Sequence, residues 1–249
     1  MMAPSHAATG LLVGVLTTAA MAPAMSVGPP ELLAGAALGA GAALLPDIDH
    51  PDSTVARAHG PLTRGLAHGA RWVSAEIHRR TATPEDAVAD GAHRFLWHTP
   101  VAAVATGVLV GLGAAASGVV LGAVLWFTLG LGLLGLAQNL PRGRRRKRLM
   151  SWPVVTLGAA LGAAALVHGG VAHGPFAGAV VGVGMLTGAL GDGLTRSGVP
   201  LAWPFAVKGR RWAMIGLPRR TRFATGTWPE RLVCWGSLIS APLAVLALA

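Results

Sequence analysis

The chain has 249 residues, of which 53% are hydrophobic and only 12% are charged, and its formal net charge is +10. A soluble globular domain carries roughly 25% charged residues, so this composition excludes an ordinary soluble domain. The positive charge alone could indicate nucleic acid, but tyrosine is absent, aromatic residues make up 5%, and we find no nucleic-acid-binding motif, so we expect anionic membrane lipid as the partner instead.

Apolar segments along the chain predict an all-α, polytopic transmembrane helix bundle of about six to seven spans. The segments are continuous and rich in alanine and glycine, which lets helices approach closely in lipid. Several are near or below the roughly 17 residues needed to cross a bilayer, so some spans are expected to be short. The segments cover residues 8–24, 32–46, 100–116, 118–138, 152–168, 175–191 and 233–248.

The first segment has some features of a cleaved signal peptide. However, no lysine or arginine precedes it, and Pro23 lies within the only candidate cleavage site, Ala22-Pro23-Ala24. We therefore expect the segment to be retained as the first span.

The 20 lysine and arginine residues all lie in three blocks, at 57–94, 142–148 and 196–231. Basic residues accumulate in the cytoplasmic loops of membrane proteins. The pattern therefore predicts that the N-terminus and the charged loops are cytoplasmic, in a cell inner membrane, and that the C-terminus lies outside.

The longest charged loop, residues 47–98, is expected to be partly helical. Residues 61–79 predict an amphipathic helix at the membrane interface. Thr83-Pro-Glu-Asp86 has the pattern of a second helix start, with acids in the first turn. Thr99 and Pro100 predict the N-cap and first residue of the next span.

Potential metal ligands first appear in the segment Pro-Asp-Ile-Asp-His-Pro, residues 46–51. The two prolines discourage helix and predict extended backbone, in which Asp47 and Asp49 point to the same side. Two carboxylates and the His50 imidazole, just beyond a membrane helix, suit a divalent cation. The alternative is a polar turn in which the aspartates cap backbone amides.

Two further groups of residues could join these aspartates. His93 and His98 lie at the mouth of a span, and Arg94 between them is suited to a phosphate or carboxylate. Asp192 closes the sixth apolar run, where a carboxylate is costly unless it is paired, binds metal or reaches water. The alternative for Asp192 is an ion pair with Arg196 at position i+4.

These motifs, in this order, resemble the YdjM-type family of bacterial inner-membrane proteins, which are described as metal-dependent hydrolases. The resemblance covers about residues 5–205, from Ser5-His6 through Leu-Pro-Asp-Ile-Asp-His-Pro-Asp-Ser and His-Arg-x-x-x-His to Gly-Asp-x-Leu-Thr-x-x-Gly-Val-Pro-Leu-x-Trp-Pro. It implies a single hydrolase-like domain over 1–249, with a basic loop and last span at 206–249. The metal ligands that it implies are His6, Asp47, Asp49, His50, His93, His98 and Asp192.

The chain departs from the family pattern at two places. The family usually carries a histidine four residues before the last aspartate, where this chain has Gly188. It also favours Thr-His-Ser where this chain has Trp97-His98-Thr99. The missing histidine weakens a two-metal interpretation and leaves open a weakened or inactive site.

The resemblance implies a hydrolase, and mixed aspartate and histidine ligands favour Zn, Mn or Fe over Mg. Asp49 or Asp192 would accept a proton from metal-activated water, and His98 would protonate the leaving group. Arg94 would hold an anionic substrate. The position at a basic membrane surface suggests a phosphoester or lipid.

The alternative is a non-enzymatic membrane protein with a structural metal site. Its exposed basic block, Arg142–Arg148, would then bind anionic lipid or a partner. A transporter has little support, because the spans are nearly free of polar groups and no internal repeat is evident.

Overall fold

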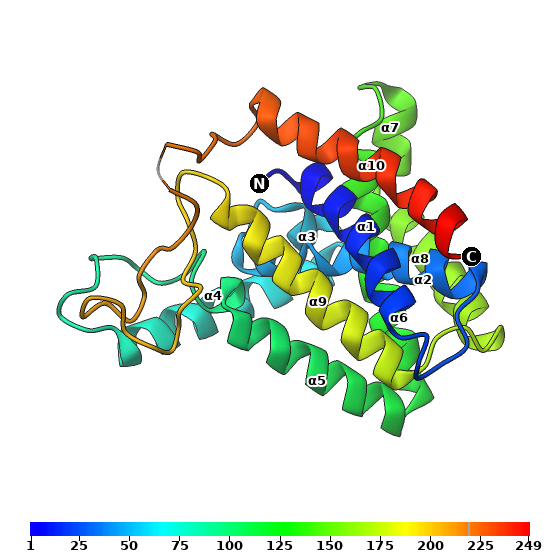
Figure 1. The fold of residues 1–249 in the computed structure, drawn as a ribbon, viewed down its shortest axis with the longest axis horizontal. Helices are drawn as coiled ribbons and strands as arrows, with labels where there is room; N and C mark the ends of the chain where they lie inside the picture. The colour runs from blue at the N-terminus through cyan, green and yellow to red at the C-terminus, as the bar shows by residue number, and fades with distance from the viewer. Residues whose placement is uncertain (219) are drawn as a thin grey trace.

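The computed structural model describes residues 1–218 and 220–249, which form an all-helical bundle (Figure 1). Within these residues there is no β-strand, only isolated bridges between loops. The predicted all-α class is therefore confirmed. The long helices are α1 (Ala3–Ala20), α2 (Pro29–Ala42), α5 (Pro100–Ala116), α6 (Gly118–Ala137), α8 (Trp152–His168), α9 (Gly174–Gly193) and α10 (Trp228–Leu248).

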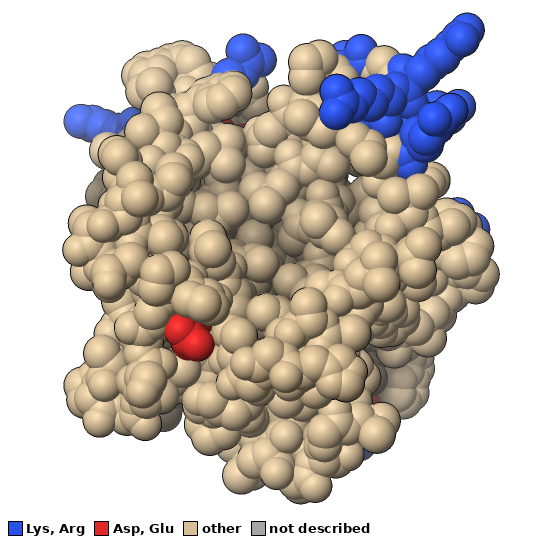
Figure 2. Space-filling view, turned by 90° about the vertical axis from the view of Figure 1, so that its right-hand side faces the viewer, with Lys and Arg blue, Asp and Glu red and all other residues tan. Residues whose placement is uncertain are grey.

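Four stretches of the bundle are long and apolar enough to cross a membrane: Pro29–Asp49, Gly118–Ala137, Gly174–Gly193 and Trp228–Leu248. Helices α5 and α8 are also apolar, with 17 residues each. Figure 2 shows a face of the bundle that is almost free of charge, with basic side chains at its upper edge. An apolar helical bundle with four candidate membrane spans is thus confirmed, whereas the number of six to seven spans stays a prediction.

Glycines bring the helices that position the site into backbone contact. Helix α1 packs on α2, and a Cβ atom on Gly14 would lie 2.0 Å from the carbonyl oxygen of Gly35. Helix α5 packs on α9, where a Cβ atom on Gly178 would lie 2.6 Å from the carbonyl oxygen of Gly107. No side chain fits at these contacts, so the small residues determine how closely the helices approach.

The segment that follows α2 is helical, not extended as predicted. Residues Leu45–Asp49 form the 3-10 helix η1, in which the Asp47 amide donates to the Leu44 carbonyl and the His50 amide donates to the Asp47 carbonyl, both at 3.1 Å. Proline is tolerated in a first helical turn because the amide it lacks would have no partner there. Pro46 occupies this position, so the chain continues helically to Asp49.

The remainder of the long loop contains α3 (Thr54–Arg57) and α4 (Pro61–Thr81). Helix α4 confirms the helix predicted over 61–79. The second predicted helix, starting near Thr83, is wrong, because residues 82–90 contain a turn and irregular backbone but no helix.

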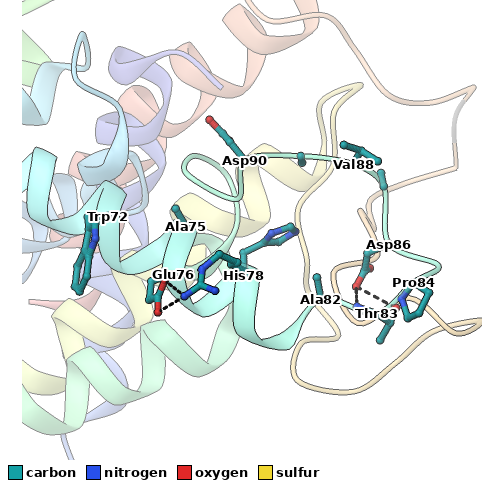
Figure 3. A pocket seen from close by; sticks show the side chains of 13 residues that line it. Trp72, Ala75, Glu76, His78, Ala82, Thr83, Pro84, Asp86, Val88 and Asp90 are labelled. Atoms are coloured by element: carbon teal, nitrogen blue, oxygen red, sulfur yellow. Dashed lines mark hydrogen bonds and ion pairs between the residues drawn. The ribbon is translucent and has the colours of Figure 1, made fainter.

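Asp86 joins this segment to the loop before α10 through contacts at both carboxylate oxygens. Oδ2 accepts from the Thr83 amide at 2.8 Å (Figure 3), and Oδ1 accepts from the Trp212 amide at 2.9 Å. The carboxylate therefore ties two loops together rather than starting a helix. A hollow of about 540 Å³ lies between the end of α4 and this turn, and no predicted metal ligand lines it.

The other charged loops frame the same end of the bundle. Helix α7 (Arg144–Leu149) presents the exposed basic block. The loop that precedes α10 includes Arg219, which lies outside the described residues.

Candidate metal centre

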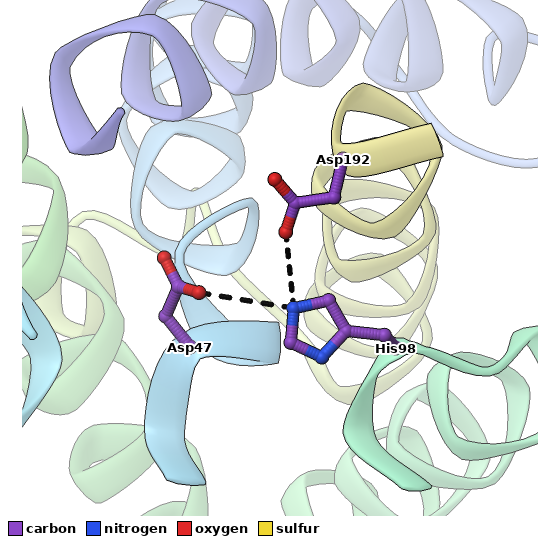
Figure 4. A group of neighbouring side chains, drawn as sticks. All are labelled: Asp47, His98 and Asp192. Carbon is purple, nitrogen blue, oxygen red and sulfur yellow. Dashed lines mark hydrogen bonds and ion pairs between the residues drawn. The ribbon is translucent and has the colours of Figure 1, made fainter. Parts of the chain in front are cut away.

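Asp47, His98 and Asp192 converge at the end of the bundle where the charged loops begin (Figure 4). Each offers a ligand atom, and these atoms all lie within 4.8 Å of one another. His98 Nε2 lies 3.0 Å from Asp192 Oδ2 and 3.7 Å from Asp47 Oδ1. Among the described residues this is the group of histidine and carboxylate side chains that could hold a metal ion.

Three different elements supply the three side chains, and local structure orients each one. Asp47 lies on η1, which extends α2, and Asp192 lies in the last turn of α9. His98 ends the 3-10 helix η2 (Leu96–His98), directly before α5. The Thr99 hydroxyl accepts from the Ala102 amide at 3.1 Å, which confirms the predicted N-cap and places His98 beside α9.

Asp192 is almost completely buried, and four groups that are or can become positively charged contact it. Besides His98, it contacts the amino group of Met1, His6 Nε2 at 3.4 Å and Arg94 Nη2 at 3.9 Å. The Met1 contact was not expected, because no sequence motif surrounds that residue. The alternative ion pair with Arg196 is wrong, because α9 ends at Gly193 and an i,i+4 contact needs both residues on one helix.

A second carboxylate–histidine pair adjoins the first group. Asp49 is fully buried, and its Oδ1 accepts from His93 Nδ1 at 2.6 Å. The rings of His93 and His98 lie 5.6 Å apart, and the His50 ring meets the His93 ring edge-on at 4.7 Å. Asp49 and His93 therefore border the centre, whereas His50 lies at its periphery.

Several buried polar atoms around the centre have no hydrogen-bond partner. They include Nδ1 of His6, Nδ1 of His98 and Oδ2 of Asp49. Buried polar atoms are nearly always satisfied, and an unsatisfied one is costly. A mixed oxygen and nitrogen donor set with unsatisfied atoms beside it fits a transition-metal ion such as Zn, Mn or Fe.

The pKa of His98 reflects the two aspartates. Burial by itself lowers this pKa, but the hydrogen bond to Asp192 and the nearby Asp47 carboxylate outweigh burial and raise it to about 9. The imidazole is therefore protonated at neutral pH when no metal competes. Because a ligand imidazole must be neutral, metal binding would displace this proton.

Gly188, where the resemblance predicts a histidine, is a helix-packing contact in this chain. A Cβ atom on Gly188 would lie 2.1 Å from the carbonyl oxygen of Ala43 and 3.1 Å from Pro46 Cγ. A histidine would not fit unless α2 and α9 moved apart. The centre therefore has no ligand from position 188.

Comparison with known proteins agrees with this architecture. No curated protein and no solved structure matches the chain. The family model described as YdjM inner membrane protein matches residues 1–249, beyond the 5–205 on which the sequence resemblance rests. The four apolar helices long enough to cross a membrane agree with this description, because helices satisfy their own backbone groups in lipid. The whole chain thus belongs to the YdjM inner membrane protein family.

Proposed function

We propose that this protein is a metal-dependent hydrolase that acts on an anionic phosphoester or lipid at the cytoplasmic face of the inner membrane. The convergence of Asp47, His98 and Asp192 within 4.8 Å carries the proposal. Carboxylates are costly in an apolar bundle and persist there mainly for function. The basic loops beside the centre favour the cytoplasmic side.

In this proposal Asp47, His98 and Asp192 hold the ion, with Zn, Mn or Fe preferred over Mg. When bound, the metal would lower the pKa of water and supply hydroxide near neutral pH. His6 Nε2, at 3.4 Å from Asp192, is suited to orienting that carboxylate or to joining the ligand set.

Asp49 is the best-placed proton acceptor. Its Oδ2 is buried and has no partner, while its Oδ1 is held by His93 at 2.6 Å. This division leaves one oxygen free for a proton and keeps the carboxylate oriented. Since His98 Nε2 faces the two aspartates, the half-buried His93 is better placed to donate a proton to the leaving group.

Arg94 is suited to holding the anionic part of the substrate. Its Nη1 atom is buried without a hydrogen-bond partner, and its Nη2 atom lies 3.9 Å from Asp192 Oδ1. Its backbone φ of 66° is uncommon for a residue other than glycine and is typical of functional sites. A guanidinium with free donors binds phosphate oxygens well.

Metal content of the detergent-purified protein tests the proposal. We expect near-stoichiometric Zn, Mn or Fe in the wild type and in His168→Ala, which alters an exposed histidine at the opposite end of the bundle. His98→Ala and Asp192→Asn should lose the ion. Absence of metal from the wild type, even after reconstitution with these ions, would refute the proposal.

Asp49→Asn separates catalysis from a structural metal. In a hydrolase this variant should retain the ion and the fold but lose phosphoester turnover. In the alternative, a non-enzymatic protein whose metal is structural, removing the ion would unfold the bundle and no variant would affect turnover. The exposed basic residues of α7 would then bind anionic lipid or a partner.

A further inference from the structure

An apolar pocket of about 470 Å³ lies beside the candidate metal centre, where η1, α4, η2, α5, α6 and α9 meet. Ile48, Leu66, Trp97, Val110, Val124 and Met185 are among its lining residues. Thr106 and Thr128 also line the pocket, and the Thr128 hydroxyl donates to the Val124 carbonyl at 2.8 Å, within its own helix. The surface of the pocket is nevertheless almost entirely apolar and suits a hydrocarbon.

Two short turns separate this pocket from the metal centre. On η1, Ile48 lines the pocket, while Asp47 and Asp49, on either side of it, face the centre. On η2, Trp97 lines the pocket and the next residue, His98, belongs to the centre. Pocket and centre are therefore lined by adjacent residues of the same two turns, whose Cα atoms lie about 3.8 Å apart along the chain.

The shape of the pocket fits one extended chain. Along α6 it runs from Val120 to Thr128, roughly 12 Å at 1.5 Å per residue. Its volume falls within the range of roughly 300–1,000 Å³ typical of single-ligand sites. The Trp97 indole, which forms part of the wall, is held by donating to the Ala70 carbonyl of α4 at 2.9 Å.

We propose that this pocket holds one hydrocarbon chain of a lipid phosphoester whose head group lies at the metal centre, so that the substrate class is a membrane phospholipid. The inference rests on the proposed hydrolase function and specifies its substrate. Arg94, with its buried and unpartnered Nη1 atom, supplies charge complementarity for the phosphate end.

The bilayer is as apolar as the pocket, so the chain gains little free energy by entering it. The head group therefore supplies most of the affinity, and the pocket selects the chain by shape. This division predicts that blocking the pocket impairs chain placement without affecting metal binding.

The test uses the full chain in phosphatidylcholine nanodiscs with phosphatidic acid that carries a photoreactive diazirine near the end of one acyl chain. Mass spectrometry locates the label after illumination. We expect it on the pocket side of α5 and α6, near Val110 and Val124, and not on the outward-facing Leu109. Metal content is measured on the same samples.

Adjacent residues on α6 provide a matched pair of variants. Val120 lines the pocket, whereas Val119 is 82% exposed and does not. Val120→Trp should lower pocket labelling about tenfold, because overfilling a packed site excludes its occupant. Val119→Trp, of equal size, should leave labelling unchanged, and both variants should retain metal.

Label spread evenly over the outward faces of α5 and α6 in the wild type would overturn the inference, as would labelling that is insensitive to Val120→Trp. Bound metal without pocket labelling would refute the binding of a lipid chain in the pocket but would remain consistent with the proposed hydrolase function. Pocket labelling without bound metal would support acyl-chain binding in the pocket and would refute the proposed hydrolase function.

Discussion

Gly188 offers the sharpest test of how the bundle positions its polar centre. In Gly188→Ala the new methyl group would lie 2.1 Å from the carbonyl oxygen of Ala43, far inside van der Waals contact with backbone. Overpacking of this kind costs roughly 1–3 kcal/mol, and a direct clash with backbone belongs at the upper end. Replacing glycine by alanine inside a helix stabilises the helix by about 1 kcal/mol through its higher helix propensity. The net destabilisation is therefore expected to be about 2 kcal/mol.

Thermal unfolding in detergent measures this effect. For a chain of this length, about 2 kcal/mol corresponds to a decrease in Tm of roughly 4–8 °C. Gly236→Ala in α10 is the matched control, because nothing lies within 4 Å of its Cβ position. The control should leave Tm unchanged or raise it slightly, since it gains helix propensity without a clash.

The same substitution should also lower the metal affinity of the centre. The atoms nearest to the new methyl group belong to Ala43 and Pro46, and Asp47 follows directly on η1. Displacing the support of a ligand typically lowers metal affinity by about 10–100-fold. Gly188→His, which introduces the residue that the sequence resemblance implies, is expected to lower metal affinity more than Gly188→Ala rather than to add a ligand. Equal Tm values and equal metal affinity in Gly188→Ala and Gly236→Ala would refute the reasoning.

Three further outcomes follow from the structure. Burial lowers the pKa of His78 in the folded protein, so below about pH 6.5 the unfolded chain binds a proton that the folded protein does not. The Tm should therefore decrease as the pH falls below about 6.5. The variant His78→Gln should show a weaker dependence of Tm on pH. Thr99→Ala removes the N-cap of α5 and should cost about 1 kcal/mol in denaturant unfolding, whereas Thr99→Ser should cost much less. Glu230→Ala leaves the partly buried amides of Gly226 and Met2 without their acceptor and should cost about 1 kcal/mol. Equal Tm values for Glu230→Ala and Glu230→Gln would contradict this role.

The long helices follow directly from uninterrupted apolar runs in the sequence. The predicted segments 100–116 and 152–168 coincide with α5 and α8, and the amphipathic stretch 61–79 lies within α4. Patterns of this kind are local, because each residue contributes through its own transfer free energy and helix preference. Proline rules are local as well, and they failed at Pro46, where α2 and η1 form one continuous helical path.

The members of the candidate centre were also identifiable, because carboxylates and histidines are conspicuous at the ends of apolar runs. Asp192 was identified from the cost of a charge in lipid. The resemblance implied His6 and His98 as neighbours of Asp192, whereas the residues alone also allowed an ion pair with Arg196 along a helix. Only the end of α9 at Gly193 and the packing of α1 and α5 against that helix decide which groups contact Asp192.

The sequence by itself determined an all-helical membrane bundle with its polar residues at one end, because apolar length and charge placement are properties of segments. Tertiary structure decided which of the seven implied ligands lie closest together, namely Asp47, His98 and Asp192. It also decided that Gly188 is a packing contact and that an apolar pocket adjoins the centre. These features depend on distances between helices. Such distances are set by glycine contacts between residues far apart in the chain, and no periodicity within one segment encodes them.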